Sequence, residues 1–525
     1  MALPESILVS ALGALTDCIL LRNEGLLPEA VARLDEIPES IRRLPPFLLE
    51  RASLLASMFR YEESLADFRT LCETAPGEEY VQFRDDVRDR AIRHFTDALV
   101  AAPDDVNSRL RRANVYLLGC AHGNALADYE AILRHHPCHR DALTNRACVL
   151  VALDRLEEAR ECYEKLVKQG PCDPTQWYNL GNVLKATHHL DGAVEAYQRA
   201  IWLQPEFAEA QLELAHCLLA AGHFTSGWRQ FEWRWKTAQL RPHYLDSAAP
   251  AWRGQHDLDG KTILLWAEQG FGDTLQFARF VPQVAERAAS VILRIPSPLL
   301  SLLQPADDRV TIIDDRSPLP THDCHCPLMS LPLALGLAAP PPACAYLTSS
   351  PGRRERWSSW LGPRKARRIG IVWAGRRSCQ NPANPTRDIP LETLRPLLRI
   401  DAEFICLQKE ITPPDATILD RLPKAFPVRC SGNELAGFAD TAALIDQLDL
   451  VVSVDSAVAH LAGALGKPCW LILRHSGEWR WPLNRSDSPW YPSLRVFRQH
   501  KAGEWNEVIH DVVSSLNCPM PLDLA

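Results

Sequence analysis

A repeating pattern of 34 residues runs through the first 241 residues of the chain, and it limits the fold more than any other feature. Four units align without a gap, and they begin at Val106, Arg140, Pro174 and Ala208. In the clearest unit, small residues (Gly181, Ala193, Ala200) let two antiparallel helices approach closely, and large residues fill the space between them. Because one such pair cannot bury its apolar face alone, units of this kind stack into a solenoid.

Weaker units lie upstream, at 11–44 and 45–78, and the 27 residues from Glu79 to Asp105 fit only the second half of a unit. These 27 residues predict either a degenerate repeat or one helix longer than usual. The spacing and residue choice resemble the tetratricopeptide repeat. The resemblance implies a superhelix whose concave groove usually holds another protein, so we expect a protein acceptor or partner there.

Bulk composition excludes several classes of protein. The net charge of −8 and the pI near 6.1 do not indicate a nucleic-acid-binding surface. The apolar stretch Ile7–Leu21 is too short for a membrane span and predicts a helix of the first repeat. The 16 cysteines are scattered without a Cys-x-x-Cys pair, and reduced thiols fit a cytoplasmic location. The run His322–Cys326 suggests either a zinc site or, as its spacing favours, the end of a strand.

A period-free α/β sequence begins near residue 259. Lys261–Ala267 predicts a buried strand, and a glycine-rich turn and a helix follow it. Gly270 and Gly272 permit a tight turn with close backbone approach. Asp273 falls at the start of the helix, where the helix macrodipole favours its ionised form. Further strands are predicted at 291–295, 310–313 and 324–328.

A basic connector then leads to a second α/β unit. Its strands are predicted at Arg368–Gly375, Glu403–Lys409, Leu448–Asp455 and Lys467–Leu473. Alternating strands and helices favour parallel sheets that bind ligands at the carboxyl ends of their strands. Two such units in tandem predict a cleft between them.

Several strand ends of the second unit carry candidate binding residues. Gly375 would let a ligand pack against backbone, and Lys409 would neutralise a phosphate. The segment Asp455–Ala457 opens a helix whose N–H groups can bind a diphosphate, and the hydroxyl of Ser456 can add a donor. His460 lies one turn later on the same face as Ser456. The alternative is that Asp455 and Ser456 only cap the helix.

These segments carry a family resemblance. Gly270–Asp273 and the run from Ser453 to Pro468 resemble the bacterial heptosyltransferase-type glycosyltransferases, in versions fused to tetratricopeptide repeats. Supporting runs are Trp373–Gly375, Leu407–Lys409, Asp440–Ala443, Glu478–Trp481, and Asp487–Pro492 followed by Arg498. The resemblance covers nearly all of 215–510. The layout is also similar, in less detail, to the O-linked N-acetylglucosamine transferases.

The resemblance implies a GT-B fold, with two Rossmann-like lobes, that uses a nucleotide-diphosphate sugar as donor and needs neither a metal nor another cofactor. Asp273 matches the residue proposed as general base. The donor-facing segments match Lys409, Asp455, Ser456, Ala457 and His460. Arg387–Pro390 resembles the family stretch Arg-Ser-Ile-Pro. The loops at 376–384 and 474–478 depart from the family pattern.

The expected fold class is thus α plus α/β, in five segments. These are a repeat solenoid (1–241), a linker (242–258), an acceptor-side lobe (259–350), a connector (351–367) and a donor-side lobe (368–525). The expected function is transfer of a sugar to a protein or surface-structure component held by the repeats. The alternatives are an inactive scaffold that keeps the fold, and a transferase directed at lipopolysaccharide or another glycan.

Overall fold

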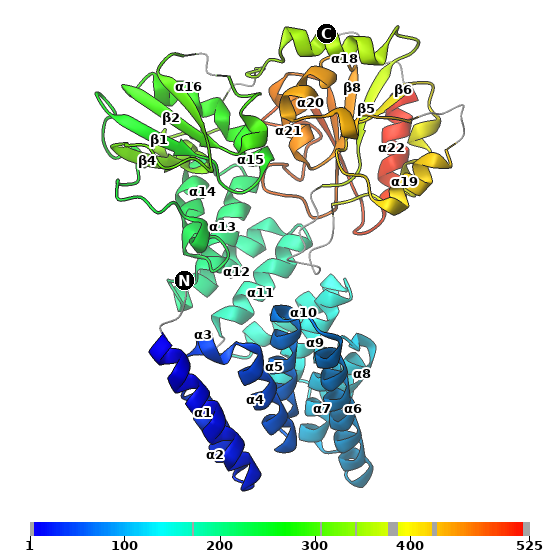
Figure 1. Ribbon diagram of the computed structural model, residues 1–525. Helices are drawn as coiled ribbons and strands as arrows, with labels where there is room; N and C mark the ends of the chain where they lie inside the picture. Colours follow the sequence, from blue (N-terminus) through cyan, green and yellow to red (C-terminus); the bar gives the residue numbers. More distant parts are fainter. Residues whose placement is uncertain are drawn as a thin grey trace. The chain divides into compact units, whose positions relative to one another are not determined.

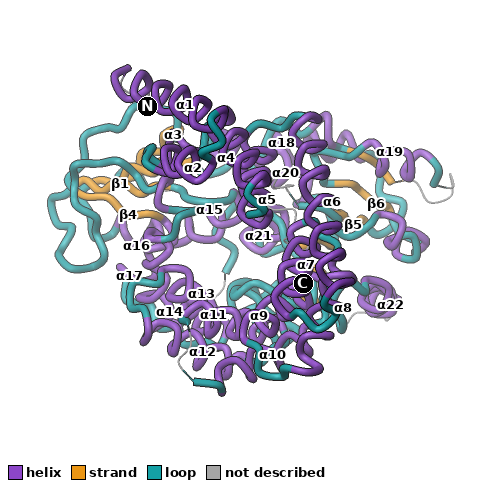
Figure 2. Tube along the Cα trace, turned by 90° about the horizontal axis from the view of Figure 1, so that it is seen from below, coloured by secondary structure: helices purple, strands orange, loops and turns teal. Residues whose placement is uncertain are grey.

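The computed structural model describes residues 5–170, 173–304, 307–341, 344–375, 387–422 and 428–517. The chain divides into two compact units, Met1–Thr187 and His188–Ala525. Among the described residues, strands lie only in the second unit, as the orange segments of Figure 2 show.

The described part of the first unit is made of helices (Figure 1). They are α1 (Glu5–Asn23), α2 (Leu27–Asp35), α3 (Glu39–Arg42), α4 (Pro45–Ser57), α5 (Tyr61–Thr74), α6 (Glu78–Ala101), α7 (Val106–Leu118), α8 (His122–His135), α9 (Arg140–Ala152), α10 (Leu156–Lys168) and α11 (Pro174–Ala186). Helices α7, α9 and α11 begin at the predicted unit starts. The segment before Val106 is one 24-residue helix, so the second of the two alternatives is correct there.

A backbone feature recurs at the turn inside each pair of repeat helices. Phe59, Cys120, Asp154 and His188 all have φ between 57° and 64°, a left-handed conformation that is uncommon for residues other than glycine. Gly25 and Gly222 take the equivalent places in their own turns. The conformation therefore belongs to the geometry of the repeat and is imposed on whichever residue occupies that position.

The second unit begins with three more repeat helices, α12 (Leu190–Leu203), α13 (Ala208–Ala220) and α14 (Phe224–Phe231). Helix α13 begins at the fourth predicted unit start. Gly227 of α14 lies against α13, where a Cβ atom would come 2.7 Å from Leu219 Cδ2. The small residue therefore allows the close approach that the repeat pattern predicted.

The first parallel sheet has the strand order β3-β2-β1-β4. Its strands are β1 (Thr262–Trp266), β2 (Ser290–Ile295), β3 (Val310–Asp314) and β4 (Cys324–Pro327), and its helices are α15 (Phe271–Phe277), α16 (Val281–Ala285) and α17 (Leu331–Ala334). Each strand matches a predicted segment to within one residue at either end. The run His322–Cys326 enters β4, which confirms the strand interpretation of that segment.

The second parallel sheet has the order β10-β9-β8-β5-β6-β7. Its strands are β5 (Arg368–Val372), β6 (Glu403–Cys406), β7 (Val428–Cys430), β8 (Leu450–Val454), β9 (Cys469–Leu473) and β10 (Leu494–Arg498). Its helices are α18 (Pro351–Leu361), α19 (Pro413–Asp420), α20 (Phe438–Ile445), α21 (Ala457–Ala464) and α22 (Trp505–Asn517). The edge strands β7 and β10 were not predicted, whereas the four inner strands were.

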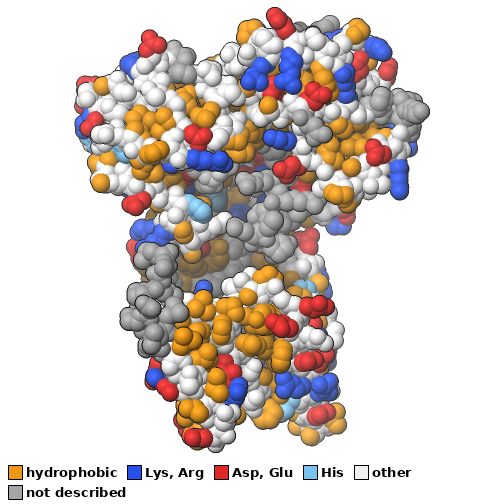
Figure 3. All heavy atoms as spheres, viewed as in Figure 1, with side chains coloured by type: hydrophobic (Ala, Val, Ile, Leu, Met, Phe, Trp, Pro, Cys, Tyr) orange, Lys and Arg blue, Asp and Glu red, His pale blue; other side chains and the backbone are white. Residues whose placement is uncertain are grey.

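Most of the basic connector forms helix α18. Figure 3 shows Lys and Arg side chains interleaved with acidic ones over this upper part of the second lobe. Arg353 and Arg356 both bond to the fully buried carboxylate of Asp440 on α20, with N–O distances of 2.7 and 3.4 Å. These two ion pairs therefore hold α18 against the second lobe.

The last repeat and both lobes share one hydrophobic core. The ring of Trp228 on α14 meets Phe277 of the first lobe edge-on, with ring centroids 6.2 Å apart. It meets Trp479 and Trp490 of the second lobe in the same manner, at 5.4 and 6.2 Å. One tryptophan of the last repeat thus packs against both lobes.

Candidate functional site

The first turns of two helices, one from each lobe, meet at the centre of the second unit. Helix α15 follows β1 and helix α21 follows β8. A Cβ atom on Gly272 would lie 2.7 Å from His460 Cδ2 and 3.6 Å from the Cα atom of Ala457. A larger residue at 272 would therefore push the lobes apart.

Asp273 lies in the first turn of α15, at the side of this contact. Its Oδ2 atom accepts a hydrogen bond from the backbone N–H of Gly270 at 2.9 Å. Its Oδ1 atom forms an ion pair with Arg480 of the second lobe. Burial raises the pKa of the Asp273 carboxyl, and the positive charge of Arg480 acts against this effect. The turn before it is strained, because Gln269 has a φ of 60°.

Arg480 organises the charges around Asp273. Its side chain is 6% exposed, and its Nε atom donates to Gln276 Oε1 at 2.7 Å. It also bonds to Glu478 at 2.8 Å, and its guanidinium lies 4.4 Å from the ring centroid of Trp479. The Glu478–Trp481 run supported the family resemblance, but nothing in its residues indicated a bond to Asp273. An arginine between tryptophans, just beyond a buried strand, was the available signal.

Asp455 follows β8 and is 8% exposed. Burial and the nearby negative charge of Glu478 raise the pKa of its carboxyl to about 7, against the lowering effect of Arg387 and Arg480. Arg387 donates to the backbone carbonyl of Asp455 at 2.8 Å. A Cβ atom on Gly375 would lie 2.9 Å from Arg387 Nε, so the space at Gly375 holds the Arg387 side chain.

The hydroxyl of Ser456 does not cap α21. Ser456 occupies the N-cap position with extended backbone, yet its side chain makes no capping hydrogen bond. Its Oγ atom lies 2.9 Å from the Oγ atom of buried Ser453. Ala457, the first residue of α21, faces Gly272 as described above. The first N–H groups of the helix are therefore not satisfied by the Ser456 side chain.

His460 is buried between the lobes. Its Nδ1 atom lies 3.0 Å from the hydroxyl of Tyr491, and its ring is 5.5 Å from that of Trp481. Burial holds the pKa of this imidazole well below its ordinary range. Its Nε2 atom is 4.0 Å from Asp455 Oδ1. A neutral His460 therefore lies beside the Asp455 carboxyl.

Lys409 is exposed beyond the end of β6. The preceding residue ties this loop to the end of β5, because Gln408 Oε1 accepts hydrogen bonds from Trp373 N at 3.2 Å and Ala374 N at 3.1 Å. The ends of β5 and β6 are thus held together next to Gly375. The loop at 376–384, which departs from the family pattern, lies outside the described residues. The loop at 474–478, which also departs from that pattern, ends at Glu478, beside Arg480.

Arg279 and Tyr346 connect the two lobes, and no sequence pattern indicated this role. Arg279 donates to the Trp490 carbonyl at 2.9 Å and to the Tyr346 hydroxyl at 3.2 Å. Its guanidinium lies 4.7 Å from the ring centroid of Tyr491, the partner of His460.

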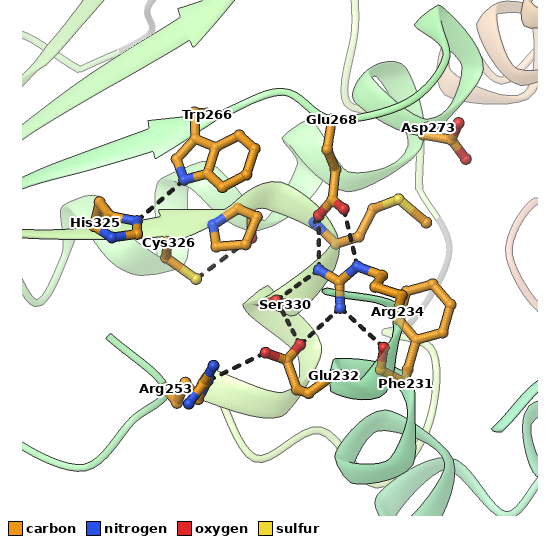
Figure 4. A network of polar contacts seen from close by, with 12 residues as sticks. Phe231, Glu232, Arg234, Arg253, Trp266, Glu268, Asp273, His325, Cys326 and Ser330 are labelled. Carbon is orange, nitrogen blue, oxygen red and sulfur yellow. Dashed lines mark hydrogen bonds and ion pairs between the residues drawn. The ribbon is translucent and has the colours of Figure 1, made fainter. Parts of the chain in front are cut away.

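A buried ionic network connects the end of the repeats to the turn before Asp273 (Figure 4). Arg234 is fully buried, and it bonds to Glu268 with N–O distances of 2.8 and 2.9 Å. It also bonds to Glu232 at 2.8 Å and to the Ser330 hydroxyl at 2.8 Å. Glu268 precedes the Gln269–Gly270 turn directly. Figure 4 shows the Asp273 carboxylate directed away from this network, on the far side of that turn.

Two general features concern metals and membranes. Within the described ranges, no group of three or more His, Cys, Asp or Glu side chains is arranged to hold a metal ion. None of the helices in the part of the chain that the structure describes has the length and apolar character needed to cross a membrane.

The fold and the charge cluster define a class of protein: helical repeats followed by two parallel α/β lobes consistent with a GT-B enzyme. Comparison with known families agrees. Residues 411–510 match glycosyltransferase family 9 (heptosyltransferase), and residues 122–174 and 178–226 match the tetratricopeptide repeat. The chain therefore joins N-terminal tetratricopeptide repeats to a C-terminal glycosyltransferase family 9 domain.

Individual relatives are distant. Protein FlbA of Caulobacter vibrioides is 26% identical over 337 residues, which are 59% of this chain and 55% of that protein. The matched region thus spans about half the length of this curated relative. Among solved structures, YrrB, a TPR protein with an unusual peptide-binding site, is 25% identical over 28% of this chain and 75% of its own, with a TM-score of 0.26. MamA from Desulfovibrio magneticus RS-1 is 18% identical over 35% of this chain and 97% of its own, with a TM-score of 0.28.

Proposed function

We propose that this chain is a metal-independent GT-B glycosyltransferase that moves a sugar from a nucleotide-diphosphate sugar to an acceptor held by the repeats. The acceptor is a protein or a component of a surface structure. The observation that carries the proposal is the cross-lobe pair of Asp273 and Arg480, in a chain whose second lobe matches the heptosyltransferase family. The free thiols among the described cysteines support a cytoplasmic reaction.

Asp273 is the general base of the proposed reaction. Its carboxylate accepts the proton of the acceptor hydroxyl as that oxygen attacks the anomeric carbon of the donor sugar. Burial and the raised pKa make the carboxylate a stronger base than an exposed aspartate. Gly270 and Gly272 support this role, because one fixes a carboxylate oxygen and the other brings α15 against α21.

The second lobe stabilises the departing diphosphate. Its negative charge develops as the bond between the anomeric carbon and the phosphate oxygen breaks. The N–H groups at the start of α21, with Arg387, Arg480 and Lys409, supply hydrogen bonds and positive charge. Without donor, Arg480 neutralises Asp273. Donor binding moves the charge of Arg480 toward the diphosphate and releases the carboxylate for proton transfer.

One observation favours the second candidate, an inactive scaffold. The Asp273 carboxylate already has two partners, the Gly270 N–H and Arg480, and the pair also holds the lobes together. A purely structural Asp273 would have the same contacts. The two candidates differ in whether the carboxylate is needed for turnover.

The test uses the purified full chain with a panel of nucleotide-diphosphate sugars and candidate acceptors, and it measures released nucleoside diphosphate together with the acceptor mass. Asp273→Asn is expected to abolish transfer and to keep nucleotide binding in a thermal-shift assay. Asp308→Asn, which changes an exposed carboxylate of the same lobe, is the matched control and should keep full activity. Near-native turnover in Asp273→Asn would reject the base assignment. Nucleotide binding by the parent chain without any transfer would favour the scaffold.

A further inference from the structure

Two cysteines lie side by side at one edge of the second sheet. Cys406 is the last residue of β6 and Cys430 is the last residue of β7, and the two are directly paired in the parallel register. Adjacent strands are separated by about 4.8 Å. A disulfide needs Cα atoms about 4.4–6.8 Å apart. The register therefore places the two residues within the range of a disulfide, although both thiols are reduced in the structure.

The two thiols have different environments. Cys406 is buried, and Cys430 is exposed on the edge strand. The neighbouring Cys406 thiol lowers the pKa of Cys430 from its ordinary 9.0 to about 7, although burial acts in the opposite direction. The Cys430 thiol, together with burial, raises the pKa of Cys406. Because the thiolate is the reactive form, Cys430 is the nucleophile of the pair near neutral pH.

We propose that Cys406 and Cys430 form a redox-active dithiol, which peroxides or small-molecule disulfides convert into a reversible intrachain disulfide. This chemistry is separate from glycosyl transfer and does not depend on it. The pairing in register, the unequal exposure of the two sulfurs and their position on a strand edge carry the proposal.

Either oxidant accepts the two electrons that disulfide formation releases. With hydrogen peroxide, the Cys430 thiolate attacks one oxygen and becomes a sulfenic acid, while the other oxygen leaves as hydroxide and takes up a proton. The Cys406 sulfur then attacks the Cys430 sulfur, its proton passes to the departing hydroxide, and the net products are one disulfide and two waters. With a small disulfide, the Cys430 thiolate attacks one sulfur and the other half leaves as a thiolate, which gives a mixed disulfide. The Cys406 sulfur then attacks the Cys430 sulfur and displaces the second thiol.

Oxidation of Cys430 makes the later attack by the Cys406 sulfur easier. The Cys430 thiolate is one of the causes that raise the pKa of Cys406. Oxidation of Cys430 removes that negative charge, so Cys406 loses its proton more readily once its partner has reacted. The buried thiol is thereby suited to resolve the intermediate on the exposed one.

The new bond would also act on the adjacent loops. Ser431 donates its hydroxyl proton to the Cys406 carbonyl at 2.7 Å. A Cβ atom on Gly432 would come 2.9 Å from the Lys409 carbonyl. These contacts tie the end of β7 to the loop that holds Gln408 and Lys409. Under the proposed function, this loop belongs to the donor side, so we expect oxidation to change nucleotide affinity.

The test treats the native full chain with hydrogen peroxide, or separately with oxidised glutathione, and then alkylates, digests and analyses it by mass spectrometry. We expect a linked pair of peptides containing Cys406 and Cys430, lighter by two hydrogen atoms and separated again by dithiothreitol. Cys430→Ser and Cys406→Ala should each abolish the link. Cys138→Ser, which changes an exposed cysteine of the first unit, should leave it intact. Oxidation that stops at Cys430, with Cys406 still open to alkylation after denaturation, would overturn the proposal.

A second measurement does not need the disulfide. The rate of alkylation of Cys430 should rise with pH around a midpoint of about 7. The midpoint should move upward in Cys406→Ala, because the neighbouring thiol that lowers the pKa of Cys430 is gone. An unchanged midpoint in a folded Cys406→Ala protein would show that the two sulfurs do not interact. Nucleotide affinity of the oxidised chain is measured in a separate experiment. If the transferase proposal fails, the alkylation and mass-spectrometry results still test the dithiol proposal.

Discussion

The carboxylate of Asp273 and the guanidinium of Arg480 form an ion pair between two lobes, although 207 positions separate them in the chain. Asp273 lies in the first turn of α15 in one lobe, and Arg480 follows an inner strand of the other. The charge state of Asp273, the proposed base, depends on Arg480, whose position is set by the second lobe. A change in either partner is therefore expected to alter both stability and proton transfer.

Replacement of Arg480 by glutamine leaves the Asp273 carboxylate without its cation. Because the carboxylate is largely buried, we expect a loss of about 3–5 kcal/mol in the free energy of unfolding. The pKa of Asp273 should rise further, so any transfer activity should shift to higher pH. Chemical denaturation and a pH–rate profile measure the two effects.

The control is a double-mutant cycle. Asp273→Asn combined with Arg480→Gln should cost clearly less than the sum of the two single changes, because the residues interact directly. Asp308→Asn combined with Arg480→Gln should be additive. Additive costs in the first combination would show that the pair contributes no coupling energy.

The raised pKa of Asp455 predicts a specific dependence of folding stability on pH. Its pKa is raised from 3.8 to about 7 in the folded chain, so between these values the folded state keeps a proton that the unfolded state has lost. The contribution of Asp455 to stability is therefore fully present below pH 4 and declines as pH rises through 7. Over that range the decline is at most about 4 kcal/mol.

Asp455→Asn removes this titration. The stability of the variant relative to the parent chain should therefore increase from pH 5 to pH 8, measured by chemical denaturation at each pH. A constant difference between the two proteins would contradict the raised pKa. Under the proposed function, donor affinity of the parent should also weaken above pH 7, because the ionised Asp455 carboxylate would then repel the diphosphate.

The sequence predicted the repeat solenoid and the inner strands accurately, for local reasons. The period marks where each helix begins, and a strand buried on both faces, such as Leu450–Val454, appears as a continuous apolar run. The edge strands were missed because they are short or interrupted by charge. Strand β7 has three residues, and β10 carries the exposed Arg495.

The candidate site could be predicted only in part. The rule that ligands bind at strand ends selected the positions of Asp273 and Asp455. It could not predict that Arg480 would contact Asp273, because no periodicity relates positions in different lobes. It also could not predict that the space beside Gly375 would hold Arg387, or that Ser456 would bond to Ser453, because side-chain packing decides both.

Replacement of Lys409 tests whether the proposed donor site extends to the end of β6. It is exposed and is proposed to contact the diphosphate. Because a hydrogen bond to a charged group contributes about 1.5–3 kcal/mol, Lys409→Ala should weaken nucleotide binding roughly tenfold or more in calorimetry. Lys365→Ala, an exposed change in the same lobe, is the control. Equal affinity in both variants would remove Lys409 from the site.

Trp228 tests the connection of the last repeat to the lobes. It is 2% exposed and contacts Trp479, the neighbour of Arg480. Trp228→Ala should cost about 3–5 kcal/mol in unfolding free energy, because it leaves a cavity between three elements. Trp202 lies on the same group of repeat helices but is 75% exposed, so Trp202→Ala should change stability by no more than about 0.5 kcal/mol. Similar losses in both variants would contradict a shared core.

The buried Arg234 provides the sharpest comparison between an interior and a surface ion pair. Arg234→Met leaves the buried carboxylate of Glu268 without its cation, and we expect a loss of about 3–5 kcal/mol. Arg253 also pairs with Glu232, but it is half exposed, so Arg253→Met should cost about 1 kcal/mol or less. Adding Glu268→Gln to Arg234→Met should recover part of the loss, because the unpaired charge is removed. If the double variant is no more stable than Arg234→Met, the cost comes from packing around the guanidinium and not from the unpaired carboxylate.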